Sequence, residues 1–119
     1  MIGGDVTDMG TSAQWTSSDW FVVEADARDG THLALPLHAP ILTNVEADFL
    51  YFYGSLADLI DGFDRYLGQI AGPKVLCLDD PICADLAGRH DVITYGTSPS
   101  ADFVACNVQA GSGAVTFDI

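Results

Sequence analysis

Basic residues are scarce in this sequence, which has four Lys and Arg against 17 Asp and Glu among 119 residues and a formal net charge of −13. All of the acids except Glu24 and Glu46 are aspartates. A chain with this balance repels phosphate backbones, so we expect it to bind neither DNA nor RNA. Any phosphate ligand would have to be held by metal ions or backbone amides, and most of the aspartates are interpreted as a solubilising surface.

Long apolar runs are also missing, and the N-terminus MIGGDVTD lacks the basic-then-apolar order of a secretory signal. We therefore expect no membrane span and a cytoplasmic location. The three cysteines include no Cys-x-x-Cys pair, and an odd number argues against a disulfide framework. We interpret Cys77, Cys83 and Cys106 as small buried side chains, and we expect His32 and His38 to be exposed.

The residues that are present predict one globular domain of the α/β class. Hydrophobic residues make up 49% of the chain and its mean hydropathy is +0.25, which is too apolar for a disordered chain. Apolar runs alternate with segments of helical periodicity, and an alternating pattern around Gly-Ser-Gly ends the chain. This order predicts a mainly parallel sheet with flanking helices and a C-terminal antiparallel hairpin. The expected strands are 20–24, 39–45, 74–80 and 92–96, the expected helices are 54–73 and 81–89, and the expected hairpin lies in 101–119.

The first candidate site residue is Glu24, which directly follows the apolar run of residues 20–23. An acid at the end of a buried strand is the pattern of the second nucleotide-binding motif of phosphate-loop enzymes, where it holds Mg²⁺ directly or through water. Mg²⁺ prefers hard oxygen ligands, so the residue type is suitable. Many buried strands also end in an acid that only caps the next turn, and on this pattern alone the structural role is favoured.

The second candidate segment begins at Thr43 and Asn44, which end an expected strand, and continues with Glu46 and Asp48. With this segment a family becomes recognisable. The stretches GGDVTDMGTSA, VVEADARDG, TNVEADFLYFYGS, LCLDDP and TYGTSPSAD occur in the order and spacing of the Mur ligase central domain. They most resemble the ligases that add L-alanine to UDP-N-acetylmuramate in peptidoglycan synthesis. The resemblance covers nearly the whole chain.

The resemblance implies an ATP-dependent ligase with Mg²⁺ as cofactor and with UDP-N-acetylmuramate and L-alanine as substrates. In this family the sugar carboxylate attacks the γ-phosphate, and the amine of L-alanine then displaces phosphate from the acyl phosphate. The resemblance makes Glu24 a metal ligand and places Thr11 and Ser12 near the UDP-sugar. It places Thr43, Asn44, Glu46 and Asp48 beside the reacting phosphate, and it assigns no catalytic residue to this chain.

Three positions depart from the family pattern. Phe49 stands where the family has a His that helps to hold a second metal, and a phenyl ring offers no lone pair to a metal. Tyr51 replaces an acid. Arg28 replaces a small hydroxyl residue, and its charge should weaken metal binding nearby.

The glycine–lysine phosphate loop, G-x-x-x-x-G-K-[ST], does not occur in residues 1–119. We therefore expect a partial central domain without the phosphate loop, the N-terminal UDP-binding domain or the C-terminal domain. We expect a fragment or truncated relative of the ligase that is inactive as an isolated chain and does not retain ATP. The alternative is a degenerate, non-catalytic binding module. Exposed sheet edges could mediate association with other chains.

Overall fold

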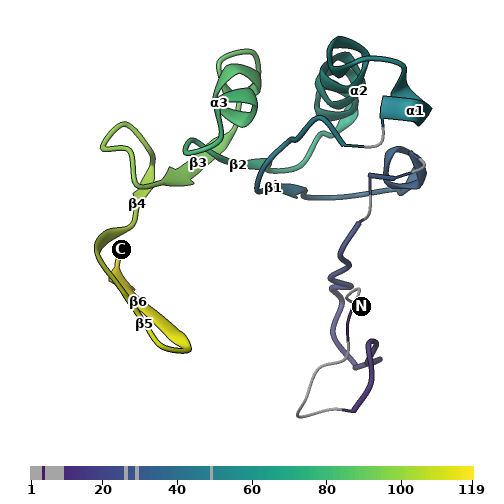
Figure 1. The fold of residues 1–119 in the computed structure, drawn as a ribbon. Helices are drawn as coiled ribbons and strands as arrows, with labels where there is room; N and C mark the ends of the chain where they lie inside the picture. The colour runs from purple at the N-terminus through teal and green to yellow at the C-terminus, as the bar shows by residue number, and fades with distance from the viewer. Residues whose placement is uncertain (1–3, 5–9, 26, 29, 49) are drawn as a thin grey trace. The chain divides into compact units, whose positions relative to one another are not determined.

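A computed structural model describes residues 4, 10–25, 27–28, 30–48 and 50–119. The chain forms two compact units, Met1–Leu35 and Pro36–Ile119. Figure 1 labels the α-helices and strands, and the regular elements in chain order also include a 3-10 helix. They are η1 (Thr31–Ala34), β1 (Ile41–Leu42), α1 (Leu50–Tyr53), α2 (Leu56–Gln69), β2 (Val75–Cys77), α3 (Pro81–Ala87), β3 (Ile93–Gly96), β4 (Phe103–Val104), β5 (Cys106–Gly111) and β6 (Ala114–Asp118).

The first unit contains the 3-10 helix η1 and an isolated β-bridge residue at Thr11, and it is otherwise irregular where it is described. The expected strand at 20–24 is wrong, because these residues have no regular structure and Trp20 is 64% exposed. A strand exists only with a hydrogen-bonded neighbour. The described strands of the parallel sheet pair with one another in the order β1–β2–β3–β4, and none of them pairs with residues 20–24. An apolar run alone is therefore not enough to form a strand at residues 20–24.

The second unit confirms the predicted α/β class. Strands β1 to β4 form a parallel sheet in sequence order, and β5 and β6 form a separate antiparallel sheet. The expected strand at 39–45 is confirmed only in its centre, because the chain leaves the sheet where the sequence turns polar at Thr43. The segment after Pro99 was expected to be antiparallel throughout, but Phe103–Val104 pairs parallel with β3.

Helix α2 follows its sequence signals closely. Ser55 is the N-cap, and its Oγ accepts a hydrogen bond of 3.1 Å from the amide of Asp58. The helix ends before Gly72 and Pro73, as expected from these two residues. Its inward face is the apolar stripe that the helical spacing predicts, and its buried side chains include Leu59, Phe63, Tyr66 and Leu67.

The core of the second unit lies between the sheet and α2 and α3. Leu76 in β2 and Leu86 in α3 are fully buried. Figure 1 shows α2 and α3 on the same side of the strands. This follows from the topology, because successive right-handed crossovers that step in one direction place their helices on one face. Among the described residues, no helix is long and apolar enough to cross a membrane.

The burial of the cysteine and histidine side chains differs in part from what the sequence predicted. Cys83 is buried, but Cys77 is only half-buried and Cys106 is exposed, so the interpretation of all three as buried is wrong. Cys106 lies on the C-terminal hairpin, all of whose residues are exposed. His38 is exposed as expected, whereas His32 is buried within η1.

Candidate functional site

The segment that follows β1 carries a hydrogen-bonded group of polar side chains. The hydroxyl of Thr43 donates to Oδ1 of Asn44 over 3.2 Å. The amide Nδ2 of Asn44 donates to Oε1 of Glu46, also over 3.2 Å. All three side chains are exposed. They stand at the carboxyl end of a parallel strand, where open α/β sheets bind their ligands.

The local backbone explains why these side chains meet. Residues 43–46 are not helical, and Val45 is buried while Asn44 and Glu46 are exposed on either side of it. In an extended segment, residues two apart point to the same side, so anchoring Val45 in the core directs Asn44 and Glu46 outward together. Asp48 is exposed two residues further along.

Glu24, Thr11 and Ser12 belong to the first unit. Glu24 is exposed in an irregular stretch and not at the end of a strand, so the expected strand-end setting is wrong for this residue. Thr11 forms a local turn in which its hydroxyl donates to the carbonyl oxygen of Ala13 over 3.2 Å. Ser12 is half-buried. Among the candidate residues of the second unit, hydrogen bonds between side chains join Thr43 to Asn44 and Asn44 to Glu46.

The chemistry of the candidate residues suits a hard cation. Every candidate side chain offers oxygen donors, and Mg²⁺ is commonly held by one or two carboxylates together with water and substrate phosphates. Within the described ranges, no three His, Cys, Asp or Glu residues form a group that could hold a metal ion. The described residues thus have suitable donor types but do not build a metal cage of their own.

The three residues that depart from the family pattern lie in different parts of the chain. Tyr51 is exposed in the short helix α1, and Arg28 is exposed in the first unit. Phe49 lies outside the described residues, as do Asp26 and Asp29 of the EADARD stretch.

The acids at the end of β2, Asp79 and Asp80, make structural hydrogen bonds. The carboxylate of Asp80 accepts a 2.7 Å hydrogen bond from the amide of Cys83 and caps α3, which has Pro81 in its first turn. Asp79 accepts hydrogen bonds of 2.8 Å and 3.0 Å from the amide and the hydroxyl of Thr97, a pairing that was not predicted from the sequence. The available signal was an acid and a Thr following neighbouring parallel strands.

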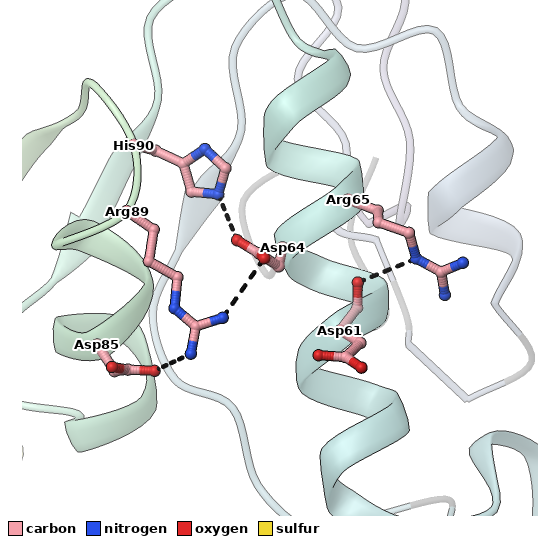
Figure 2. Close-up of polar contacts among 6 residues, drawn as sticks. All are labelled: Asp61, Asp64, Arg65, Asp85, Arg89 and His90. Atoms are coloured by element: carbon pink, nitrogen blue, oxygen red, sulfur yellow. Dashed lines mark hydrogen bonds and ion pairs between the residues drawn. The ribbon is translucent and has the colours of Figure 1, made fainter.

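A second charged group joins α2 to the turn after α3. Figure 2 shows that Asp64 accepts a 2.7 Å hydrogen bond from Nε2 of His90 and a 3.4 Å hydrogen bond from Arg89. Arg89 also pairs with Asp85 one turn back on α3, at 2.5 Å. The hydrogen bond from His90, followed by the charge of Arg89, lowers the pKa of Asp64. Asp64 and Asp85 each pair with Arg89 or His90. We therefore interpret the group as a structural link between α2 and the turn after α3.

The buried thiol of Cys83 is also unsuited to act as a nucleophile. Burial, followed by the hydrogen bond with the carboxylate of Asp80, raises its pKa to about 12. A thiol with this pKa is protonated at neutral pH and is a poor nucleophile. The exposed residues Thr43, Asn44 and Glu46 after β1 are therefore a better candidate site in the second unit than Cys83.

Comparison with known proteins agrees with the resemblance inferred from the five motifs. The chain is 40% identical over 122 residues to the UDP-N-acetylmuramate–L-alanine ligase of Bartonella quintana, a match that covers 98% of this chain and 26% of that protein. It is 38% identical to the ligases of the same name from Methylorubrum extorquens and Rhodospirillum centenum, with 98% of this chain covered in each case and 26% and 25% of those proteins. No family model matches the sequence.

These matches show that the chain corresponds to a segment of UDP-N-acetylmuramate–L-alanine ligase. It spans about a quarter of the length of the curated relatives that it matches.

Proposed function

We propose that the chain is the middle of the ATP-binding central domain of a UDP-N-acetylmuramate–L-alanine ligase. The observation that carries this proposal is the match to such ligases across 98% of the chain, at 37–40% identity among the relatives compared. The parallel sheet with polar side chains at the end of β1 supports it, because this is where an α/β nucleotide enzyme presents residues to its ligand.

In this proposal the segment after β1 acts on the phosphate side of the ligand. Asn44 orients the carboxylate of Glu46 through the hydrogen bond between their side chains. The hydroxyl of Thr43 fixes the amide of Asn44 by donating to its oxygen, which leaves Nδ2 directed at Glu46. The result is a carboxylate held in one orientation on an exposed surface, as required of a group that positions a phosphate–metal complex.

By the family resemblance, Glu24 would be a Mg²⁺ ligand, Asp48 would lie beside the reacting phosphate, and Thr11 and Ser12 would lie near the UDP-sugar. When bound, Mg²⁺ would neutralise charge on the phosphate oxygens during transfer. The chain's own residues would bind and orient the reactants. Sequence 1–119 contains no glycine–lysine phosphate loop, so we propose that the isolated chain neither binds ATP nor turns over substrate.

A degenerate binding module is the second candidate. Arg28, Phe49 and Tyr51 stand where the family pattern has groups that favour a metal site. If these substitutions have ended metal binding, the chain retains the fold without the chemistry.

The test is a chimera in which this chain replaces the matching 122-residue region of the Bartonella quintana ligase. We expect Glu24→Gln in the chimera to raise the Mg²⁺ concentration needed for half-maximal phosphate release and to lower the maximal rate at least about tenfold, because one charged oxygen ligand is lost. Asp19→Asn removes a charge from the same unit as a matched control and should leave both values unchanged. Equal Mg²⁺ dependence in the Glu24→Gln variant and its parent would contradict the role of Glu24.

A further inference from the structure

The loop that joins β3 to β4, here called the β3–β4 loop, consists of residues 97–102 and connects two strands that pair in parallel. A connection between parallel strands usually takes a dozen or more residues and contains a helix. This loop contains no helix. Its course therefore depends on local hydrogen bonds and not on a packed crossover helix.

Two carboxylates hold the two ends of the β3–β4 loop. Asp79, which follows β2, accepts hydrogen bonds of 2.8 Å from the amide of Thr97 and 3.0 Å from its hydroxyl. Asp102 accepts hydrogen bonds of 2.8 Å from the amide of Thr94 and 2.7 Å from its hydroxyl. The start of the loop is thus tied to the end of β2, and its last residue is tied to β3.

Gly96, the last residue of β3, allows Asp79 to reach the loop. Gly96 is buried and has a φ of 153°. A Cβ at this position would lie only 2.7 Å from Oδ1 of Asp79, which is closer than side-chain carbons approach an oxygen. The absence of a side chain therefore lets the carboxylate lie against the strand end, where it meets the amide of Thr97.

The β3–β4 loop lies along the same edge of the sheet as the candidate site. Strands β1, β2 and β3 are neighbours and run parallel, so Thr43, Asp79 and Thr97 all follow carboxyl ends at one edge. Ligands of open α/β sheets bind along this edge. Two strand spacings, on the order of 10 Å, separate the ends of β1 and β3, and a nucleotide is long enough to span them.

The surface of the β3–β4 loop carries hydroxyl groups and no basic side chain. Thr97 and Ser100 are exposed, and the hydroxyl of the half-buried Ser98 lies 2.8 Å from that of Ser100. Hydroxyls both donate and accept hydrogen bonds, as the hydroxyls of a sugar do. A phosphate would find no counter-charge on this loop, so a neutral sugar is the better match.

We propose that Asp79 is a positioning residue of the ligase, which holds the β3–β4 loop so that its hydroxyls bind the sugar of a nucleotide substrate. This inference rests on the proposed function. The sugar is the ribose of ATP or a sugar of UDP-N-acetylmuramate. Asp79 acts through the loop and touches no reacting atom, so its loss weakens substrate binding and leaves the chemical step unchanged.

The first test is the exchange of the Thr97 amide hydrogen, followed by NMR in the isolated chain. Asp79→Ala removes the acceptor and should speed this exchange at least about tenfold. Asp79→Asn keeps an acceptor oxygen at the same place and should exchange like the parent. Asp91→Ala is the matched control, because it removes an exposed acid before the opposite end of β3.

The second test is kinetic and uses the chimera with the Bartonella quintana ligase. Asp79→Ala should raise the KM for ATP or for UDP-N-acetylmuramate at least about fivefold, with kcat within about twofold of the parent. The KM that rises identifies which sugar the loop binds, and the KM for L-alanine should not change. Asp79→Asn should restore the parent KM, and Asp91→Ala should leave all values unchanged.

Thr97→Val is the milder variant in case Asp79→Ala does not fold. It removes the hydroxyl donor but keeps the amide bond to Asp79, and it should raise the same KM by a smaller factor.

Three results with an active chimera would overturn the proposal alone: unchanged KM values in the Asp79→Ala variant, a fall in kcat without a rise in KM, or a loss in Asp79→Asn equal to that in Asp79→Ala. An unchanged exchange rate of the Thr97 amide in Asp79→Ala would also overturn it. A folded parent chimera without substrate-dependent turnover would instead refute the proposed function, and this inference with it.

Discussion

Carboxylates at strand ends have two distinct settings in this chain. Asp79 accepts a hydrogen bond from Thr97, which links the ends of β2 and β3. Asp80 accepts a hydrogen bond from the first turn of α3 and caps that helix. Glu46 is held instead by a side-chain amide on an exposed surface. Pro81 is of a residue type favoured in the first turn of a helix, so the sequence around Asp80 is consistent with the helix cap that the structure has. For Asp79 the only signal is that it and Thr97, which is 18 positions away, follow neighbouring parallel strands.

The cap at Asp80 has a measurable effect on stability. Asp80→Ala should lower the free energy of unfolding by about 1 kcal/mol, because the amide of Cys83 loses its hydrogen-bond acceptor. Urea unfolding followed by circular dichroism measures this change. Asp91→Ala, which removes an exposed charge after α3, serves as the control and should shift the midpoint much less.

Phe49 is the residue whose replacement should improve the site. The family pattern has a metal-holding His here, and imidazole nitrogen can ligate where a phenyl ring cannot. In the chimera, Phe49→His should raise turnover about a hundredfold or more, at ~1.4 kcal/mol per decade of rate. Turnover is measured against Mg²⁺ concentration for both proteins. If both saturate at the same concentration with equal rates, Phe49 is a packing residue in a drifted gene.

At the scale of elements, local signals predicted the helices and the hairpin. The cap at Ser55, the apolar stripe of α2 and the stop before Gly72 and Pro73 are all local features of the sequence, and the structure has all three. The apolar run at 20–24 carried an equally clear strand pattern, yet a strand depends on a neighbour that local sequence does not specify. The parallel pairing of β4 was missed for the same reason.

The link between α2 and the turn after α3 should make stability depend on pH. The folded state lowers the pKa of Asp64 through His90 and Arg89. A lowered folded pKa gives stabilisation that is present above the ordinary Asp pKa of about 3.9 and is lost as pH falls through the folded pKa. Asp64→Asn should therefore reduce the urea midpoint at pH 5 to 7, and the difference from the parent should shrink toward pH 3.

Asp61→Asn is the matched control for this experiment, because it removes one charge from α2 outside the group in Figure 2 that joins the two helices. It should not reproduce the pH-dependent loss. A difference between Asp64→Asn and its parent that stays constant from pH 7 to pH 3 would show that the carboxylate contributes nothing through its ionisation.

At the scale of the whole molecule, α2 and α3 lie on one side of the parallel sheet (Figure 1), and the chain spans about a quarter of the length of the relatives that it matches. The sequence predicted the sheet, the class and the family resemblance, because five short motifs lie in register along nearly the whole chain. It could not predict that α2 and α3 lie on the same side of the sheet, since that depends on the direction in which the strands are ordered.

The central claim is that this chain supplies the middle of a ligase central domain and has no activity alone. Phosphate release in the presence of UDP-N-acetylmuramate, L-alanine, ATP and Mg²⁺ tests it most directly, with the isolated chain and the Phe49→His chimera assayed side by side. The account predicts no release by the isolated chain and release by the chimera that requires both substrates. Turnover by the isolated chain that disappears with Glu24→Ala, or a folded chimera without substrate-dependent release, would contradict it.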